Sequence, residues 1–270
     1  MMPTTVAALQ FDPQKGGTEA NLDRVEAMLD GLDADLIVLP ELFATGYFFD
    51  STEQAHGLAE PVPDGPTVRR MERWARTSGS TFVGGMAERD GDAVFNSAVV
   101  VTPRGWLGTY RKTHLFYEET LHFTPGDSGF QVWTVTDRNR REYRLGVMVC
   151  FDWFFPESAR SLAMNGADVI AHPSNLVLPH CPRSMPIRAL ENHVFTITAN
   201  RTGTETNGRE DLTFIGQSVI CGPDASVLAS APQADEAILS ASIDPRESRR
   251  RRVNRYNDLL GDRRPSLYAG

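Results

Sequence analysis

Hydrophobic and polar residues follow one another along this chain in blocks that are typical of a mixed α/β protein. Residues 4–11 predict a strand, and residues 35–40 form a continuous apolar run, as expected of a strand buried on both faces. Between these two strands, apolar residues recur with helical spacing at Leu22, Val25, Leu29 and Leu32. Another helix is predicted to start at Pro66, because the fixed φ of proline suits a first helical turn.

The alternation continues to residue 243. Further strands are predicted at residues 81–87, 93–101, 144–150, 168–172, 195–200, 217–221 and 237–243. Further helices are predicted at residues 156–165 and 184–194, and loops at residues 175–182 and 203–211. No repeat or long linker interrupts the pattern. We therefore expect a single domain over residues 1–270, with residues 244–270 as a C-terminal extension.

Composition narrows the class of protein. With 41% hydrophobic and 23% charged residues, the chain is neither collagen-like nor disordered. Its net charge of −8 disfavours a general nucleic-acid binder, which should be basic. Three scattered cysteines favour a reducing compartment over a disulfide framework. The first twenty residues lack the pattern of a targeting segment, and no apolar run approaches the ~20 residues of a membrane span. We expect a cytoplasmic protein that binds neither membranes nor nucleic acid.

Cys150 is the first candidate for chemistry. It ends an apolar strand pattern and precedes a helix expected to begin near Pro156. A thiol between a strand end and a helix N-terminus is expected to have a lowered pKa and to form a thiolate readily. The alternative is a buried structural cysteine, because free cysteine is among the most buried residue types.

Four further charged residues are candidates for chemistry. Glu41 directly follows the apolar run 35–40, where a desolvated carboxylate is suited to act as a general base. Lys112 follows a strand-like segment, and its ammonium is suited to stabilise an oxyanion. Glu118 and Glu119 are adjacent carboxylates, and the residues alone do not choose between them. Each of these side chains also fits an ordinary capping or surface position.

Taken together, these segments resemble the nitrilase, or carbon–nitrogen hydrolase, superfamily. The resemblance rests on LPE at 39–41, VFNSAVVVTPRGWLGTY at 94–110, YRKTHLF at 110–116 and GVMVCFDWFFPE at 146–157. These segments occur in the family's order, and the likeness covers almost the whole chain. CFDWFFPE and MPIRALEN resemble, in particular, short single-domain nitrilase-like proteins of thermophilic archaea and bacteria.

The resemblance implies a four-layer α-β-β-α sandwich and a homodimer or larger even assembly. It also implies a catalytic triad of Glu41, Lys112 and Cys150, with Glu119 as a second glutamate in an E-x-x-x-F pattern that ends at Phe123. Cysteine would attack an amide or nitrile carbon, glutamate would transfer protons, and lysine would stabilise the tetrahedral oxyanion. All of these roles belong to side chains, so no metal or organic cofactor is expected.

Residues after the nucleophile bear on the substrate. Many members of the superfamily carry an arginine there that holds a substrate carboxylate, whereas this chain has Trp153 and Phe154. A pocket lined by Tyr47, Phe116, Trp153 and, in one reading, Phe154 favours a small neutral aliphatic acyl group. In the other reading, Trp153 and Phe154 face away from the site. Phe151-Asp152 replaces the Trp-Glu common in nitrilases, which favours small amides over nitriles as substrates.

Two other functions compete with this interpretation. In a Cys–His hydrolase, His172 at the end of strand 168–172 would be the best candidate base. In an interaction protein, the six arginines of residues 246–255 would bind an anionic partner, although a helix that salt-bridges the acidic body explains them more simply. The histidines and cysteines lack the paired short spacing of a zinc site.

The C-terminal extension predicts an assembly contact. Val253, Tyr256 and Leu260 share one face of a hypothetical helix. Such a face needs a surface to cover it. Family resemblance implies that this surface belongs partly to a partner subunit.

Overall fold

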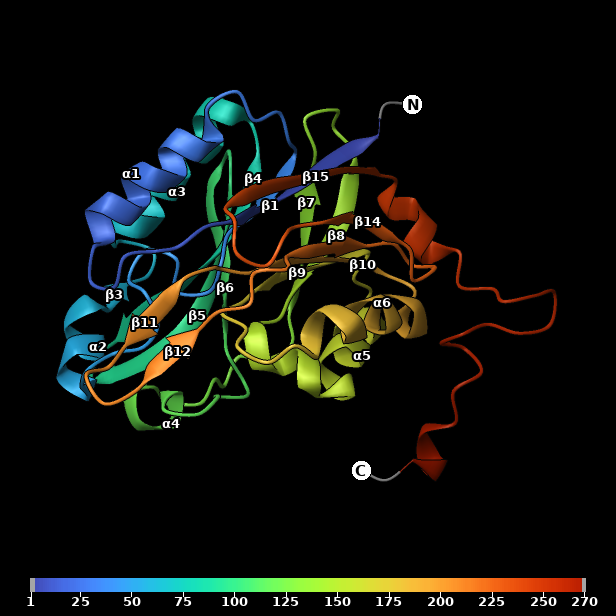
Figure 1. Cartoon of the computed structure of the whole chain (residues 1–270). Helices are drawn as coiled ribbons and strands as arrows, with labels where there is room; N and C mark the ends of the chain where they lie inside the picture. Colours follow the sequence, from blue (N-terminus) through green and yellow to red (C-terminus); the bar gives the residue numbers. More distant parts are fainter. Residues whose placement is uncertain (1–2, 269–270) are drawn as a thin grey trace.

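The computed structural model describes residues 3–268, in which two β-sheets pack face to face between helices (Figure 1). The first sheet contains, in spatial order, β15 (Ala237–Ile243), β1 (Thr4–Gln10), β2 (Leu36–Val38), β4 (Thr81–Asp90), β5 (Ala93–Thr102) and β6 (Gly105–Arg111). The short β3 (Glu60–Pro61) pairs with β4. The second sheet runs β14 (Val227–Ser230), β13 (Val219–Cys221), β10 (Phe195–Ala199), β9 (Val169–Pro173), β8 (Glu142–Val147) and β7 (Val132–Thr136).

Helices cover the outer face of each sheet. On the first sheet lie α1 (Thr18–Leu29) and α3 (Pro66–Ser78), and on the second lie α5 (Pro156–Met164) and α6 (Cys181–Asn192) (Figure 1). The shorter helices are α2 (Thr52–Leu58) and α4 (Glu119–His122), with 3₁₀ turns η1 (Cys150–Phe154), η2 (Pro245–Arg249) and η3 (Pro265–Leu267). The fold is therefore the four-layer α-β-β-α sandwich that the family resemblance implies.

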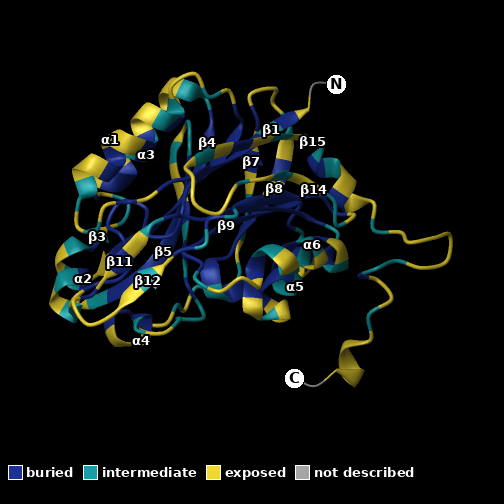
Figure 2. Ribbon diagram, viewed as in Figure 1, coloured by how far each residue is buried: buried dark blue, intermediate teal, exposed yellow. Residues whose placement is uncertain are grey.

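Alternating burial explains the layers. Along β1, Val6 and Ala8 belong to the core between the sheets, whereas Ala7 and Leu9 belong to the core under α1 and α3. Because successive strand residues point to opposite faces, one fully apolar strand supplies both cores. Figure 2 shows these inner strands as buried, with exposed residues on the outer helices and the C-terminal segment.

Most predicted elements are present, with shifted ends. The predicted strand 144–150 stops at Val147, and Cys150 begins a 3₁₀ turn instead. The predicted loop 175–182 is shortened because α6 already starts at Cys181. Residues 203–211 are not a plain loop. They form most of a hairpin, β11 (Thr204–Thr206) and β12 (Asp211–Thr213).

The prediction of an α-helical face in the C-terminal extension is wrong. After η2 the chain leaves the body of the domain in irregular turns (Figure 1). Side chains compete with the helical backbone here: Asn254 Oδ1 accepts from the Tyr256 N–H, and Asp258 Oδ1 accepts from the Gly261 N–H. Val253 and Tyr256 remain 69% and 75% exposed, while Leu260 is buried, so the three share no face.

Two arginines of the extension form ion pairs, one with the acidic body of the domain and one with a neighbouring carboxylate. Arg249 pairs with the buried Asp168 at 2.7 Å, and Arg246 pairs with Asp244 at 2.7 Å. These contacts agree with the salt-bridging explanation of the arginine run, although the run is not an α-helix.

Candidate active site

Cys150 lies just beyond β8, in a strained turn. Its φ is +42°, a left-handed value that costs energy for any residue except glycine. Asp152 holds the turn, because its Oδ2 accepts the Val149 N–H at 2.8 Å and the Tyr110 hydroxyl at 2.7 Å. His114 Nδ1 lies 2.7 Å from the other oxygen of Asp152. The thiol-bearing turn is thus fixed by a buried carboxylate that the sequence does not mark as functional.

The expected lowering of the thiol pKa is wrong. Burial raises the pKa of Cys150 well above its ordinary value, and the Glu41 carboxylate raises it further. Lys112 and the backbone N–H of Asn175 oppose this shift without reversing it. Because α5 starts only at Pro156, after the whole η1 turn, the thiol does not cap its N-terminus. This environment therefore favours the neutral thiol over the thiolate.

Glu41 and Lys112 meet directly. Glu41 follows β2 and Lys112 follows β6, and the Lys112 Nζ donates to Glu41 Oε1 at 2.7 Å. The same ammonium donates to Glu119 Oε1 at 2.7 Å. All three side chains are almost completely buried. A lysine bridges two carboxylates in a buried site, where charge interactions are strong.

Two glycines permit this close packing. A Cβ on Gly85 of β4 would lie 2.5 Å from the Glu41 Cα, and one on Gly126 would lie 2.1 Å from the Arg111 carbonyl oxygen and 2.8 Å from that of Lys112. Any larger residue would displace the backbone that carries Glu41 or Lys112.

Burial and charge shift the pKa values of the cluster in opposing ways. Burial alone would lower the pKa of Lys112, but the carboxylates of Glu119 and Glu41 outweigh it and raise that pKa above its ordinary value. Burial raises the pKa of Glu119 to about 7, although Lys112 favours its ionised form. Lys112 therefore stays charged, while Glu119 exchanges a proton near neutral pH.

The structure distinguishes the two adjacent glutamates. Glu119 points to Lys112, whereas Glu118 bonds to Asn207 and Arg209 of the β11–β12 hairpin. Tyr47 takes a different position from the one predicted. Instead of lining the pocket at Cys150, it is buried behind the cluster, and its hydroxyl donates to Glu119 Oε1 at 2.6 Å.

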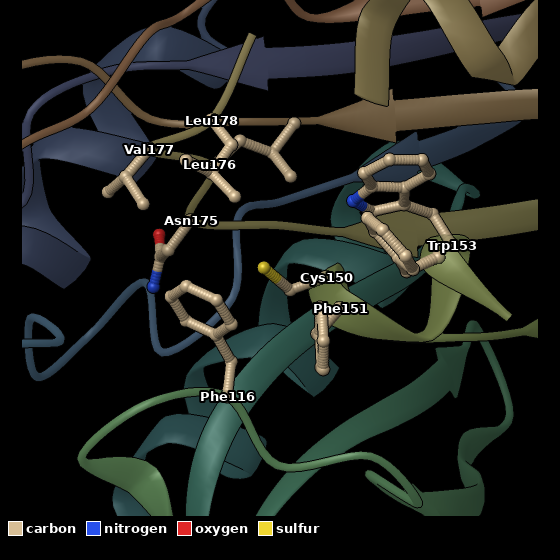
Figure 3. A pocket seen from close by; sticks show the side chains of 9 residues that line it. Phe116, Cys150, Phe151, Trp153, Asn175, Leu176, Val177 and Leu178 are labelled. Carbon is tan, nitrogen blue, oxygen red and sulfur yellow. The ribbon is translucent and has the colours of Figure 1, made fainter. Parts of the chain in front are cut away.

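An apolar pocket opens at the thiol. Figure 3 shows the Cys150 thiol pointing toward the space between Phe116 and Asn175, with Trp153 on the other side. The lining is completed by Phe151, Phe154, Leu176, Val177 and Leu178. The predicted Phe116 and Trp153 thus both line this pocket, and so does Phe154, with its side chain half-exposed. None of the nine described lining residues carries a carboxylate, an ammonium or a guanidinium.

Sequence reasoning missed two buried asparagines. Asn96 of β5 donates to Glu41 Oε1 at 2.7 Å and reaches Glu119 Oε2 at 3.3 Å. Asn175 lines the pocket and donates its side-chain amide to the Glu41 carbonyl at 2.9 Å. Asn96 lies inside the matched segment 94–110, which was the available signal, but its polar side chain in a strand gave no indication of its partners.

His172 is near the thiol but is turned to other partners. Its Nε2 lies 2.9 Å from the Cys150 carbonyl oxygen, and its Nδ1 lies 3.0 Å from the Thr198 hydroxyl. Burial lowers the pKa of His172 to about 4. Both ring nitrogens are engaged with structural partners, so the geometry gives no support to a Cys–His pair.

Residues 3–268 contain no group of three or more His, Cys, Asp or Glu side chains arranged to hold a metal ion. Over the same residues, no helix has both the length and the apolar character needed to cross a bilayer.

The structure combines a four-layer sandwich, a buried Glu–Lys–Glu cluster and a cysteine in a strained turn, and comparison with known proteins assigns the chain to a family. The sequence model of the carbon–nitrogen hydrolase family matches residues 5–252. The chain belongs to this family, within the nitrilase superfamily, and is an enzyme of that superfamily.

Individual relatives agree with this assignment. A nitrilase of Pyrococcus abyssi is 48% identical over 97% of this chain and 98% of its own. An N-carbamoylputrescine amidase of Solanum lycopersicum is 33% identical over 98% of this chain and 93% of its own. The solved amidase of Nesterenkonia sp. is 26% identical, with a TM-score of 0.79 over 98% of this chain and 95% of that one. In a mutant of the Nesterenkonia sp. AN1 amidase, acrylamide has added to the active-site cysteine.

Proposed function

We propose that this protein hydrolyses small neutral aliphatic amides to a carboxylic acid and ammonia through a thioester on Cys150. The observation that carries the proposal is the Lys112 ammonium, bonded at 2.7 Å to both Glu41 and Glu119 beside a buried thiol. An amide carbon is a weak electrophile, so a strong nucleophile and charge stabilisation must be held together.

The first half of the reaction forms the thioester. Glu41 takes the thiol proton as the Cys150 sulfur attacks the amide carbon, and the carbonyl π electrons move to oxygen. Lys112 and the backbone N–H of Phe151 stabilise that oxyanion. When the oxyanion collapses, the carbon–nitrogen bond breaks, and Glu41 delivers its proton to the leaving nitrogen, which departs as ammonia. Glu119 holds Lys112 and orients the substrate nitrogen.

The second half returns the enzyme to its starting state. Glu41 removes a proton from water, whose oxygen attacks the thioester carbon. The carbon–sulfur bond then breaks, the acid leaves, and the proton on Glu41 returns to the Cys150 thiolate. Burial raises the pKa of the thiol, so the first step depends on Glu41 as the base.

The pocket supports a small neutral acyl group. Its lining is apolar around the thiol and provides no charged partner for a substrate carboxylate. A substrate like N-carbamoylputrescine carries a terminal ammonium. The lining of the pocket at Cys150 has no carboxylate to pair with that ammonium. These features favour an uncharged aliphatic amide over either charged class.

Nitriles are the second candidate. The Pyrococcus abyssi relative, 48% identical to this chain, carries the name nitrilase. Attack of the Cys150 sulfur on a nitrile carbon would give a thioimidate, with the thiol proton passed through Glu41 to the nitrile nitrogen. A first water would then release ammonia and leave the thioester on Cys150. A second water would hydrolyse that thioester to the acid, with the same residues transferring the protons.

Ammonia release over a panel of small amides and their matching nitriles tests the proposal. We expect higher kcat/KM for neutral amides, nitriles second, and no release with Cys150→Ala. Ammonia release from that variant at the wild-type rate, or none from the wild type with any amide or nitrile in the panel, would overturn the proposal.

A further inference from the structure

The β11–β12 hairpin is distant from Glu119 in sequence but is hydrogen-bonded to the segment that carries it. Its tip holds the two residues before Glu119: the Tyr117 hydroxyl donates to Glu210, and Arg209 donates to Glu118 at 3.0 Å. Asn207 donates to Glu118 at 3.0 Å as well. These residues belong to the loop between β11 and β12 or lie directly before α4.

At the base of the same hairpin, Glu205 binds the backbone of Tyr47, the residue whose hydroxyl contacts Glu119. Glu205 of β11 is buried, and its Oε2 accepts the backbone N–H of Tyr47 at 2.9 Å and of Phe48 at 2.6 Å. The Tyr47 hydroxyl in turn donates to Glu119 Oε1 at 2.6 Å. Gly46, with φ +77°, permits this approach, because a Cβ there would lie 2.7 Å from Glu205 Oε1.

A second buried charge fixes Glu205 in place. The guanidinium of Arg201 is fully buried and pairs with the remaining oxygen of Glu205. The same guanidinium bonds Asp12 at 2.5 Å and lies over the Phe214 ring at 4.1 Å. A buried ion pair is costly to form, and here each of its partners has further contacts that hold it in one orientation.

We propose that Glu205 is a positioning residue that sets the Tyr47 hydroxyl, and through it Glu119, against Lys112. The β11–β12 hairpin, residues 204–213, is thereby part of the machinery of the site, although it does not line the pocket. The inference rests on the proposed function for its kinetic consequence. Glu205 acts by holding backbone, so it should affect the rate of reaction more than the binding of substrate.

A matched pair of double variants isolates this anchor. In Arg201→Met/Glu205→Gln, no unpaired guanidinium remains, and the amide oxygen of residue 205 still accepts the N–H groups of Tyr47 and Phe48. In Arg201→Met/Glu205→Ala, that acceptor is gone. We expect the first to keep kcat within about threefold of wild type and the second to lose about tenfold or more, with similar KM in both. Equal losses in the two variants would overturn the proposal.

Tyr47→Phe tests the path from Glu205 to Glu119. It removes only the hydroxyl and leaves the backbone N–H that Glu205 accepts. Added to Arg201→Met/Glu205→Ala, it should lower kcat by no more than about twofold further, because both changes interrupt one path. If the kcat losses of Tyr47→Phe and of Arg201→Met/Glu205→Ala multiply in the combined variant, Glu205 does not act through Tyr47. That result would refute its positioning role. Glu60→Gln is the control: this glutamate holds the Thr67 N–H at 2.8 Å and should leave kcat unchanged.

A readout that needs no turnover separates this inference from the proposed function. Alkylation of Cys150 by iodoacetamide, followed by mass spectrometry, depends on the same cluster, while Cys181 and Cys221 are buried away from the pocket. The two double variants should differ in alkylation rate even if no amide is turned over. Equal alkylation rates would overturn the positioning role. If the alanine variant does not fold, Arg209→Ala replaces it, because Arg209 is exposed and pairs with Glu118. Unchanged alkylation and kcat in Arg209→Ala would count against a role of the hairpin in positioning Glu119.

Discussion

The side-chain amide of Asn96 donates a 2.7 Å hydrogen bond to Glu41 Oε1, the same oxygen that accepts from Lys112. The backbone carbonyl of Asn96 also accepts the Lys112 N–H at 2.8 Å. One residue of β5 therefore orients both partners of the buried ion pair.

Asn96→Asp should be damaging because it adds a third carboxylate to a buried site that holds two. We expect kcat/KM to fall by roughly two orders of magnitude with the fold retained. Asn165→Asp is a control at an exposed position and should leave the kinetics unchanged. Equal activity of the two variants, measured by ammonia release, would contradict a role for Asn96 in holding Glu41.

Cys150→Ala should abolish turnover while leaving the far-UV circular dichroism unchanged. Glu41→Gln and Lys112→Ala should each cost several orders of magnitude in kcat, and combining them with Cys150→Ala should add little, because the three act as one unit. Mass spectrometry of wild type trapped with substrate should locate the acyl adduct on Cys150. An adduct on Cys181 or Cys221 would refute the assignment.

The pH dependence of stability should reveal two opposed titrations. Burial holds the pKa of Glu119 at about 7 against an ordinary 4.5, so the folded state binds the extra proton and stability falls as pH rises through this window. Burial holds the pKa of His172 at about 4 against 6.5, so the unfolded state binds the proton and stability falls as pH drops through nearly the same window. Each contribution is about 3 kcal/mol, and they largely cancel.

Single variants should separate these contributions. Relative to wild type, Glu119→Gln should lose stability on acidification from pH 7 to 4.5, because the His172 contribution is then unopposed. His172→Gln should gain stability over the same change. Urea midpoints at the two pH values measure both, and parallel behaviour of the two variants would contradict the assignment.

A charge at the pocket mouth should redirect specificity. Phe154 lines the pocket and is half-exposed, so Phe154→Arg can place a guanidinium there without burying it. We expect the ratio of kcat/KM for an amide bearing a free carboxylate over a neutral amide to rise by about tenfold. Phe154→Lys should show a smaller rise, because lysine lacks the bidentate geometry of arginine. A wild-type preference for carboxylate-bearing amides would defeat the underlying argument.

The C-terminal extension should contribute to a homodimer or larger even assembly. Val253, Tyr256, Leu267 and Tyr268 are each more than half exposed, an unusual amount of uncovered apolar surface for one segment. Light scattering should find an even oligomer for the full chain and a smaller species for a truncation before Asp244. A monomeric full chain, or unchanged assembly after truncation, would contradict this expectation.

Local pattern was enough to predict most of the strands and helices, while their arrangement in four layers was implied by the family resemblance. Strand β1 and helix α3 carry their periodicity and their start signals within a few residues, so their positions follow from the sequence alone. The tail was predicted as a helix from the spacing of Val253 and Tyr256, but bonds from Asn254 and Asp258 to the backbone form turns instead.

The triad was named from the family resemblance, because the residues alone left Glu41, Lys112 and Cys150 each with a structural alternative. Glu41 and Cys150 each follow an apolar run, which local sequence reveals. The raised thiol pKa depends on complete burial beside Glu41, and the place of Tyr47 depends on Glu119 and Glu205, all distant in sequence. Such contacts exist only after the sheets have packed.

The cluster is divided between the two sheets: Glu41 and Lys112 follow strands of the first, and Cys150 follows a strand of the second. During synthesis, the first sheet stays incomplete until β15, made near the end of the chain, pairs beside β1. In a chain whose two sheets have not yet packed together, Cys150 is therefore held apart from Glu41 and Lys112, and the cluster assembles only when the sandwich does.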